Sequence, residues 1–164
     1  MKALFLDVDG VLNSVDWMQQ IDGRNAWDQA DGGTQLDPAA VLRLERIVRE
    51  TGALVVISSS WRKMYDPETI EGFLRRHGFT GKVIGETAHH IPMEERTTEQ
   101  QSSGKYQRGW EIKAWVDEHP EVTHFAILDD DSDMDGVADH FVHTEYPHGL
   151  TDEHVRKVLD LLEG

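Results

Sequence analysis

The chain has 164 residues and no cysteine, and its 31 acidic and 16 basic residues give a formal net charge of −15 at pH 7. The length predicts a single domain over residues 1–164, and the lack of cysteine excludes disulfides and thiolate chemistry. Nucleic-acid binding depends on Lys and Arg contacts to phosphates, so this charge argues against a large nucleic-acid footprint but permits a local basic rim.

Apolar runs predict the strands. Residues 3–8 form a short apolar run that ends in acidic side chains, and residues 54–57 and 125–128 form two more. Continuous apolar runs are typical of strands that are covered on both faces of a parallel sheet. Residues 82–84 and 140–143 are weaker strand candidates.

Helical patterns lie between these strands. Asp37 and Pro38 provide an N-cap and a first-turn proline for a helix that Gly52 closes, and Thr151 caps a last helix. The apolar residues at helical spacing are Val41, Leu44, Ile47 and Val48; Ile70, Phe73 and Leu74; Ile112, Trp115 and Val116; and Val155, Val158, Leu159 and Leu162.

The alternation of strands and helices predicts an α/β fold. We expect a Rossmann-like, doubly wound and mainly parallel sheet with helices on both faces. Residues 13–35 and 85–107 lack periodicity, and loops of that length inside a compact domain are functional or mobile. Neither is large enough for a domain with its own core.

Acidic residues follow the first strand. Asp7 and Asp9 lie at its carboxyl end, where ligands bind in open α/β sheets, and Gly10 permits a sharp turn directly after them. Two carboxylates this close in a low dielectric repel each other, and a divalent cation resolves that repulsion. The alternative is a solvated strand end, which the preceding apolar run disfavours.

Polar residues also follow the second strand. Ser58 and Ser59 can donate a hydrogen bond to a phosphoryl oxygen, and Arg62 can clamp the same group with two hydrogen bonds. A simple N-cap cluster for the next helix is compatible with this interpretation.

An acidic run follows the strand at residues 125–128. Asp129 and Asp130 bring more carboxylate to the same edge of the sheet, and carboxylate oxygens are natural ligands of Mg²⁺. Residues 131–136 also match the opening of an EF-hand calcium loop. That interpretation is disfavoured, because Val142 stands where the loop needs a glutamate and a strand, not a helix, precedes it.

Together these segments resemble the haloacid dehalogenase superfamily. The resemblance extends from Ala3 to about Thr151 and rests on DVDGVLN, the Ser after the second strand and the Asp pair after a later strand. The segments DVDGVLN, SSSWR, RGWEI and ILDDDSDM look closest to a bacterial and phage branch, which resembles the phosphatase domain of polynucleotide kinase–phosphatases and related RNA-repair enzymes.

The resemblance implies catalytic roles for four residues. Asp7 would be the nucleophile that forms an aspartyl-phosphate, and Asp9 the general acid and then the base that activates water. Ser58 would hold the phosphoryl group, with Ser59 as the alternative if the strand is one residue longer. The family also needs a cation from a third segment, and we favour Arg108 at the start of the predicted helix.

The resemblance also implies a metal site and a substrate-binding set. The expected cofactor is Mg²⁺, and its expected ligands are the side chains of Asp7 and Asp130 and the backbone carbonyl of Asp9. Asp129 would either bind the metal as well or orient one of its ligands. Lys105 is the second choice for the third-segment cation, and Lys113 is more typical of a solvated helix position. The expected substrate-binding residues are Asn13, Ser59, Arg62 and Lys105.

Members of the family with a large cap domain act on small molecules, because the cap closes over them. The insertions at residues 13–35 and 85–107 are only long loops, so the resemblance implies no cap or a minimal one. Such an open site suits a phosphate at the end of a polymer or on a protein. The residues Trp17, Trp27, Trp61 and Tyr106 flank the site segments and can stack on a base, unless at least two of them pack in the core. We therefore expect a Mg²⁺-dependent phosphomonoester hydrolase that acts on nucleic-acid 3′ ends or nucleotides.

Other functions remain open. One is a phosphatase of another small monoester or of a phosphoprotein, and another is an inactive acidic interaction domain, which intact Asp7 and Asp9 disfavour. A receiver domain phosphorylated on Asp is disfavoured, because the second strand here ends in serine.

The expected location is the cytoplasm. No apolar run reaches the ~20 residues of a membrane helix, and no signal peptide precedes the first strand. We expect no membrane partner. The alternatives to a cytoplasmic protein are an unmarked export route or a domain cut from a longer chain. Fusion to, or cooperation with, kinase or ligase repair modules is compatible with the resemblance.

Overall fold

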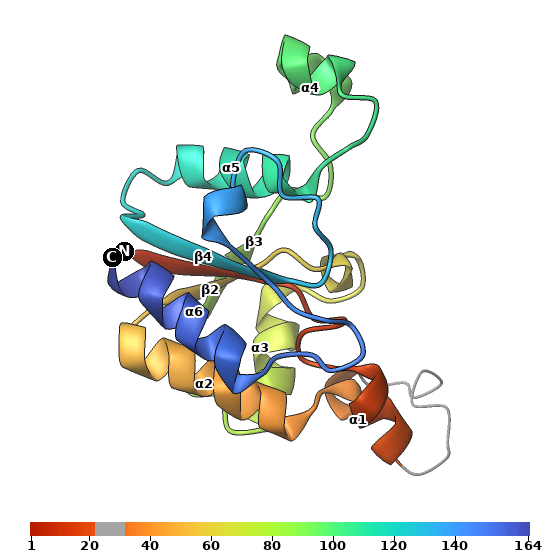
Figure 1. Ribbon diagram of the computed structural model, residues 1–164, viewed down its shortest axis with the longest axis vertical. Coiled ribbons are helices and arrows are strands. Elements are labelled where there is room, and N and C mark those ends of the chain that lie inside the picture. The colour runs from red at the N-terminus through yellow and green to blue at the C-terminus, as the bar shows by residue number, and fades with distance from the viewer. Residues whose placement is uncertain (22–31) are drawn as a thin grey trace.

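A parallel five-stranded sheet lies at the centre of the computed structural model, which describes residues 1–21 and 32–164 (Figure 1). The strand order is β3-β2-β1-β4-β5, and each neighbouring pair is parallel, which confirms the predicted sheet. The strands are β1 (Lys2–Leu6), β2 (Leu54–Ile57), β3 (Val83–Glu86), β4 (His124–Asp129) and β5 (Phe141–His143).

Helices cover both faces of the sheet (Figure 1). One face packs against α2 (Pro38–Thr51), α3 (Pro67–Arg75) and α6 (Asp152–Glu163), and the other against α5 (Arg108–Glu118). Side chains of β1 alternate between the two cores: Leu4 belongs to the first and Phe5 to the second. The doubly wound fold is confirmed.

Local sequence signals set the long helices. The Asp37 side chain accepts a hydrogen bond from the Ala39 N–H at 2.8 Å, and Gly52 ends α2 with a left-handed φ of 71°. The N-cap residue of α6 is Thr151, as expected. None of the described helices combines the length and the apolar composition of a membrane span.

The two aperiodic stretches contain short helices that periodicity did not predict. Residues 13–35 include α1 (Val15–Gln20) and the 3-10 turn η2 (Gly32–Gln35), and residues 22–31 lie outside the described part. The segment before α5 holds η4 (Met93–Glu95) and α4 (Thr98–Ser102), which projects from the body in Figure 1. These elements are too short for an apolar stripe and depend on caps such as Thr97 with Gln100. The remaining 3-10 turns are η3 (Ser60–Lys63) and η5 (Ala138–His140).

Candidate active site

The expected site residues meet at the carboxyl ends of the central strands. The strand register aligns Leu6 with both Ile57 and Leu128, so the residues that follow form one row. The Asp7 N–H donates to the Leu128 carbonyl at 2.9 Å, and the Ser58 N–H donates to the Leu6 carbonyl at 3.0 Å. The sheet thus brings segments far apart in the chain to one edge.

Three carboxylates form a cluster at this edge. Asp7, Asp129 and Asp130 each place an oxygen within 4.8 Å of the others, and Asp129 is fully buried. Burial and the Asp129 charge raise the pKa of Asp7 to about 8, and burial raises the pKa of Asp129 to about 6. Burial also raises the pKa of Asp130. This set of hard oxygen donors, costly to ionise together, fits a divalent cation such as Mg²⁺.

Arg108 brings positive charge to this cluster. An Nη1 atom of Arg108 lies 2.7 Å from Asp129 Oδ2 and 3.4 Å from Asp7 Oδ1. Both carboxylates raise the pKa of the Arg108 guanidinium, which stays charged although it is largely buried. A single guanidinium balances a single carboxylate, so the fully ionised cluster still needs added positive charge.

The start of α5 fixes the position of Arg108. The Arg108 N–H donates to Asp133 Oδ2 at 3.2 Å, and the Gly109 N–H donates to the Asp133 carbonyl at 2.9 Å. A Cβ at Gly109 would lie 2.5 Å from the Asp135 carbonyl oxygen, so the close approach requires glycine. The acidic tract that resembles a calcium loop therefore anchors α5 instead, with Asp135 also accepting from the Trp110 ring N–H.

The other two candidate cations lie differently. Lys113 pairs with Asp117 at 2.8 Å on the exposed side of α5, as expected for a solvated position. Lys105 is exposed on the segment that leads into α5. Among the three, Arg108 is the one that contacts Asp7 and Asp129.

A tight loop follows Asp7. Gly10 has a φ of 77°, and a Cβ on it would lie 2.6 Å from the Asp130 carboxyl carbon. The buried Thr144 donates to the Gly10 carbonyl at 2.8 Å, and its own N–H donates to the Asp129 carbonyl. Thr144 joins the loop to the cluster, and no motif in the sequence indicated it.

Two side chains hold the Asp9 carboxylate. The Trp61 ring N–H donates to both carboxylate oxygens at 3.1 Å, and the Asn13 amide donates to Oδ1 at 2.8 Å. Asn13 also accepts from the Gly10 N–H at 3.0 Å and is buried. The structure thus places Asn13 inside the loop, where it orients Asp9. The Asp9 carboxylate lies outside the three-carboxylate cluster.

The two serines after β2 differ in their surroundings. The Arg108 charge, the Ser59 side chain and the Val8 backbone lower the pKa of Asp7, against the larger effects of burial and of the Asp129 charge, so the Ser59 hydroxyl lies near the expected nucleophile. Ser59 also accepts from the Trp61 N–H at 3.2 Å. The Ser58 hydroxyl is fully buried and has no hydrogen-bond partner within the described residues. β2 ends at Ile57, as predicted, yet Ser59 is the serine whose side chain acts on Asp7.

Arg62 lies in a buried ion pair. Its Nη2 is 2.7 Å from Glu111 Oε2, its Nη1 donates to the Ser58 carbonyl, and both charged side chains are almost fully buried. Tyr106 donates to the other Glu111 oxygen at 3.0 Å. Sequence analysis missed Glu111, although an acidic residue among the apolar positions of RGWEI was a usable signal.

The aromatic residues contribute less exposed surface than expected. Trp61 is 3% exposed and packs edge-on against Phe73, so its assignment as a base-stacking ring is wrong. Tyr106 is half-buried and stacks on His90 with centroids 4.5 Å apart. Trp17 is half-buried in α1, and Trp27 lies outside the described residues.

The comparisons with known proteins agree with this geometry. Residues 3–155 match the family model described as the HAD domain in Swiss Army Knife RNA repair proteins. Neither the curated proteins nor the solved structures gave a match. Because the family model covers most of the chain, and the family's acidic residues meet at one edge of a parallel sheet, the protein belongs to the haloacid dehalogenase superfamily, in the family of HAD domains found in RNA repair proteins.

Proposed function

We propose that this protein is a Mg²⁺-dependent phosphomonoester hydrolase that works through an aspartyl-phosphate and acts on nucleic-acid 3′ ends or nucleotides. The observation that carries the proposal is the buried cluster of Asp7, Asp129 and Asp130 with Arg108 against Asp7. Such a cluster suits a reaction in which a carboxylate meets a phosphate dianion, because both need positive charge nearby.

In the proposed first step, an Asp7 oxygen attacks phosphorus. A bond forms between that oxygen and phosphorus while the bond to the leaving oxygen breaks, and Asp9 gives its proton to the leaving oxygen. Asp9 then takes a proton from water as the water oxygen attacks the same phosphorus. That step releases inorganic phosphate and regenerates the Asp7 carboxylate.

The neighbouring residues prepare these steps. Trp61 and Asn13 hold the Asp9 carboxylate in one orientation. Arg108 offsets charge at Asp7, and the Ser59 hydroxyl would donate to a phosphoryl oxygen. Asp7, Asp129 and Asp130 would hold Mg²⁺, with the Asp9 backbone carbonyl as a further expected ligand. When bound, the metal would keep the cluster ionised and offset charge on the transferring phosphoryl group.

The substrate assignment rests on the family and on the surface. The matching family comes from RNA repair proteins, which supports a nucleic-acid end and cooperation with kinase or ligase modules. The net charge of −15 disfavours a long polyanion, so we propose that the terminal nucleotide alone is gripped.

The test is phosphate release by wild type, Asp7→Asn and an exposed control, Asp160→Asn. We expect Mg²⁺-dependent turnover of an aryl phosphate and of 3′-phosphorylated oligonucleotides by wild type and the control. The rate of phosphate release should be at least ~10³-fold lower for Asp7→Asn, because an amide cannot attack phosphorus. Wild-type turnover by Asp7→Asn would rule out the mechanism, and a tenfold preference for a sugar phosphate or phosphopeptide would replace the nucleic-acid substrate.

A further inference from the structure

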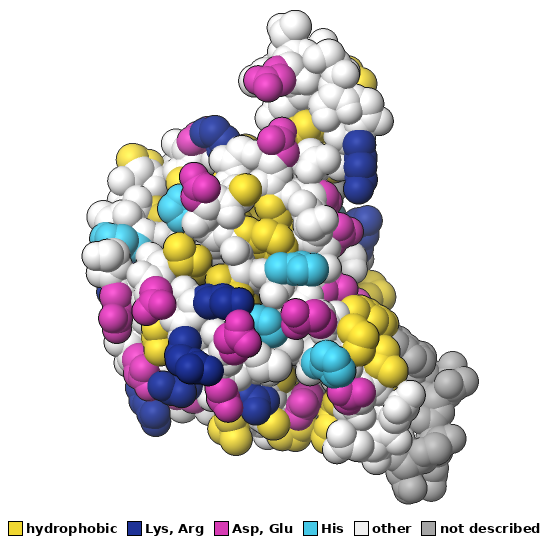
Figure 2. All heavy atoms as spheres, viewed as in Figure 1, with side chains coloured by type: hydrophobic (Ala, Val, Ile, Leu, Met, Phe, Trp, Pro, Cys, Tyr) yellow, Lys and Arg dark blue, Asp and Glu magenta, His cyan; other side chains and the backbone are white. Residues whose placement is uncertain are grey.

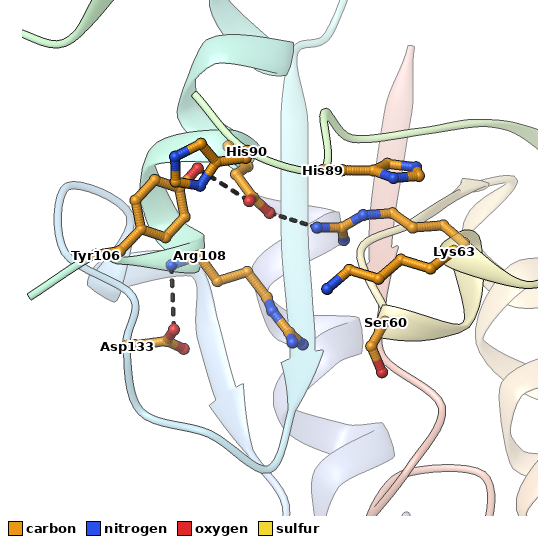
Figure 3. A pocket seen from close by; sticks show the side chains of 9 residues that line it. Ser60, Lys63, His89, His90, Tyr106, Arg108 and Asp133 are labelled. Carbon is orange, nitrogen blue, oxygen red and sulfur yellow. Dashed lines mark hydrogen bonds and ion pairs between the residues drawn. The ribbon is translucent and has the colours of Figure 1, made fainter. Parts of the chain in front are cut away.

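A pocket beside the carboxylate cluster lies between η3 and α5 (Figure 3). Its volume is about 260 Å³, and Arg108 lines it while also contacting Asp7 at 3.4 Å. The pocket and the proposed catalytic centre therefore share a wall. Its size is below the ~300–1,000 Å³ of sites for drug-sized ligands, so it suits one chemical group of a larger substrate.

The charges that line this pocket are unevenly compensated. Arg62 and Glu111 neutralise each other in their buried pair. Asp133 accepts from the Arg108 N–H through Oδ2, and its negative charge acts on the Arg108 guanidinium, while its Oδ1 is buried without a partner among the described residues. The exposed Lys63 has no ion pair or hydrogen bond among residues 1–21 and 32–164, and the buried Nε of Arg62 also lacks a partner there.

The side chains of this pocket converge. Figure 3 shows the Lys63 ammonium and the Arg108 guanidinium directed into the same space, with the Ser60 side chain beside it and His89 on the opposite side. Elsewhere, on the face shown in Figure 2, Lys and Arg side chains are interspersed with Asp and Glu. The unpaired ammonium of Lys63 with a hydroxyl donor beside it is the chemistry that recognises a phosphate.

We propose that this pocket binds a second phosphate of the substrate, next to the phosphomonoester that Asp7 attacks. The inference rests on the proposed function and specifies its substrate class. Lys63 provides the charge, and the Ser60 hydroxyl beside it provides a donor. The ligand is a phosphate one nucleotide away, from either a nucleoside bisphosphate or the first internucleotide linkage. Because Trp61 is buried, the contact of Lys63 with the second phosphate replaces the base stacking that was expected of the Trp61 ring.

The test compares Lys63→Gln with Lys82→Gln, an exposed lysine just before β3 that loses the same charge. The substrates are adenosine 3′-phosphate, adenosine 3′,5′-bisphosphate, and a dinucleotide and a ten-nucleotide RNA that each end in a 3′-phosphate. We expect a second phosphate to raise wild-type kcat/KM about tenfold through KM, with no further gain for the longer RNA. The ratio of kcat/KM with the second phosphate to kcat/KM without it should fall to about 1 in Lys63→Gln and stay at the wild-type value in Lys82→Gln.

The two phosphate sources give separate results. A Lys63-dependent preference for the bisphosphate or for the dinucleotide supports the pocket and names its source. Equal kcat/KM with and without the second phosphate, or an equal loss in both lysine variants, overturns it. Calorimetric titration of Asp9→Asn protein with the mono- and bisphosphate supplies a readout without turnover. If the protein hydrolyses aryl phosphate but shows no such preference, the second phosphate site is wrong and the proposed phosphatase activity stands. If it does not hydrolyse aryl phosphate, the proposed phosphatase activity itself is wrong.

Discussion

Trp61 links the apolar core to the proposed acid–base chemistry, because its ring N–H donates to both oxygens of Asp9. Trp61→Phe keeps much of the packing and removes the donor. We expect kcat to fall about tenfold for an alkyl phosphate, whose leaving oxygen needs a proton, and much less for an activated aryl phosphate.

The measurement for this variant is the ratio of the two kcat values. A general loss of folded protein lowers both rates equally, so the ratio isolates the orientation of Asp9 from any packing defect. An unchanged ratio would show that Trp61 has a packing role alone.

The sequence predicted which residue types gather at the site but not which atoms meet. Asp7, Asp129 and Asp130 follow apolar strands, so their common edge could be predicted from the parallel sheet. The contacts of Trp61 with Asp9 and of Arg62 with Glu111 join residues about fifty positions apart. Such pairings depend on how η3 and α5 pack, and single-chain periodicity carries no information about that.

The buried pair of Arg62 and Glu111 joins η3 to α5 and lines the pocket. Glu111→Gln leaves a buried guanidinium without its counter-charge, and we expect a loss of ~3–5 kcal/mol in the free energy of unfolding. The double variant Arg62→Met with Glu111→Leu should lose less, because no unpaired charge remains.

Urea unfolding measures both effects. Lys113→Met on the same helix is the control, because its pair with Asp117 is exposed and worth at most ~1 kcal/mol. If Glu111→Gln were no more destabilising than Lys113→Met, the pair would not hold the two elements together.

At the level of elements, apolar patterns that extend over several turns predicted the long helices, whereas the short helices were not predicted. The helices α2 and α6 combine a cap with three or more turns of apolar spacing, and both form where expected. The helices α1 and α4 have six and five residues, which is too short for periodicity to distinguish them from a loop. Their caps, Ser14 and Thr97, were the signals available in the sequence.

The stability of the whole molecule should depend on both pH and metal, and the two effects should be linked. Without metal, folding raises the pKa of Asp7 from 3.8 to about 8 and that of Asp129 to about 6. The folded state then holds protons that the unfolded chain has lost, so stability in chelator falls as pH rises from about 4 to about 8. Mg²⁺ competes with those protons, and its stabilising effect should be larger at pH 8 than at pH 5.5.

Thermal unfolding in chelator and in Mg²⁺ at the two pH values checks this linkage. Asp7→Asn should be more stable than wild type in chelator at pH 8, because it removes a buried negative charge from the cluster. A Mg²⁺ effect that is equal at both pH values, or larger at pH 5.5, would contradict a metal site at these carboxylates.

The central claim is that Asp7 carries the phosphoryl group during turnover, and peptide mass spectrometry of acid-quenched protein tests it most directly. Asp9→Asn protein mixed with Mg²⁺ and an activated aryl phosphate should accumulate the intermediate, because the leaving group needs no proton but the attacking water lacks its base. We predict the mass of one phosphoryl group on the peptide that contains Asp7, and its absence from Asp7→Asn protein treated alike. Turnover of the same substrate by wild type, with no phosphoryl group on Asp7 in either quenched protein, would contradict the account.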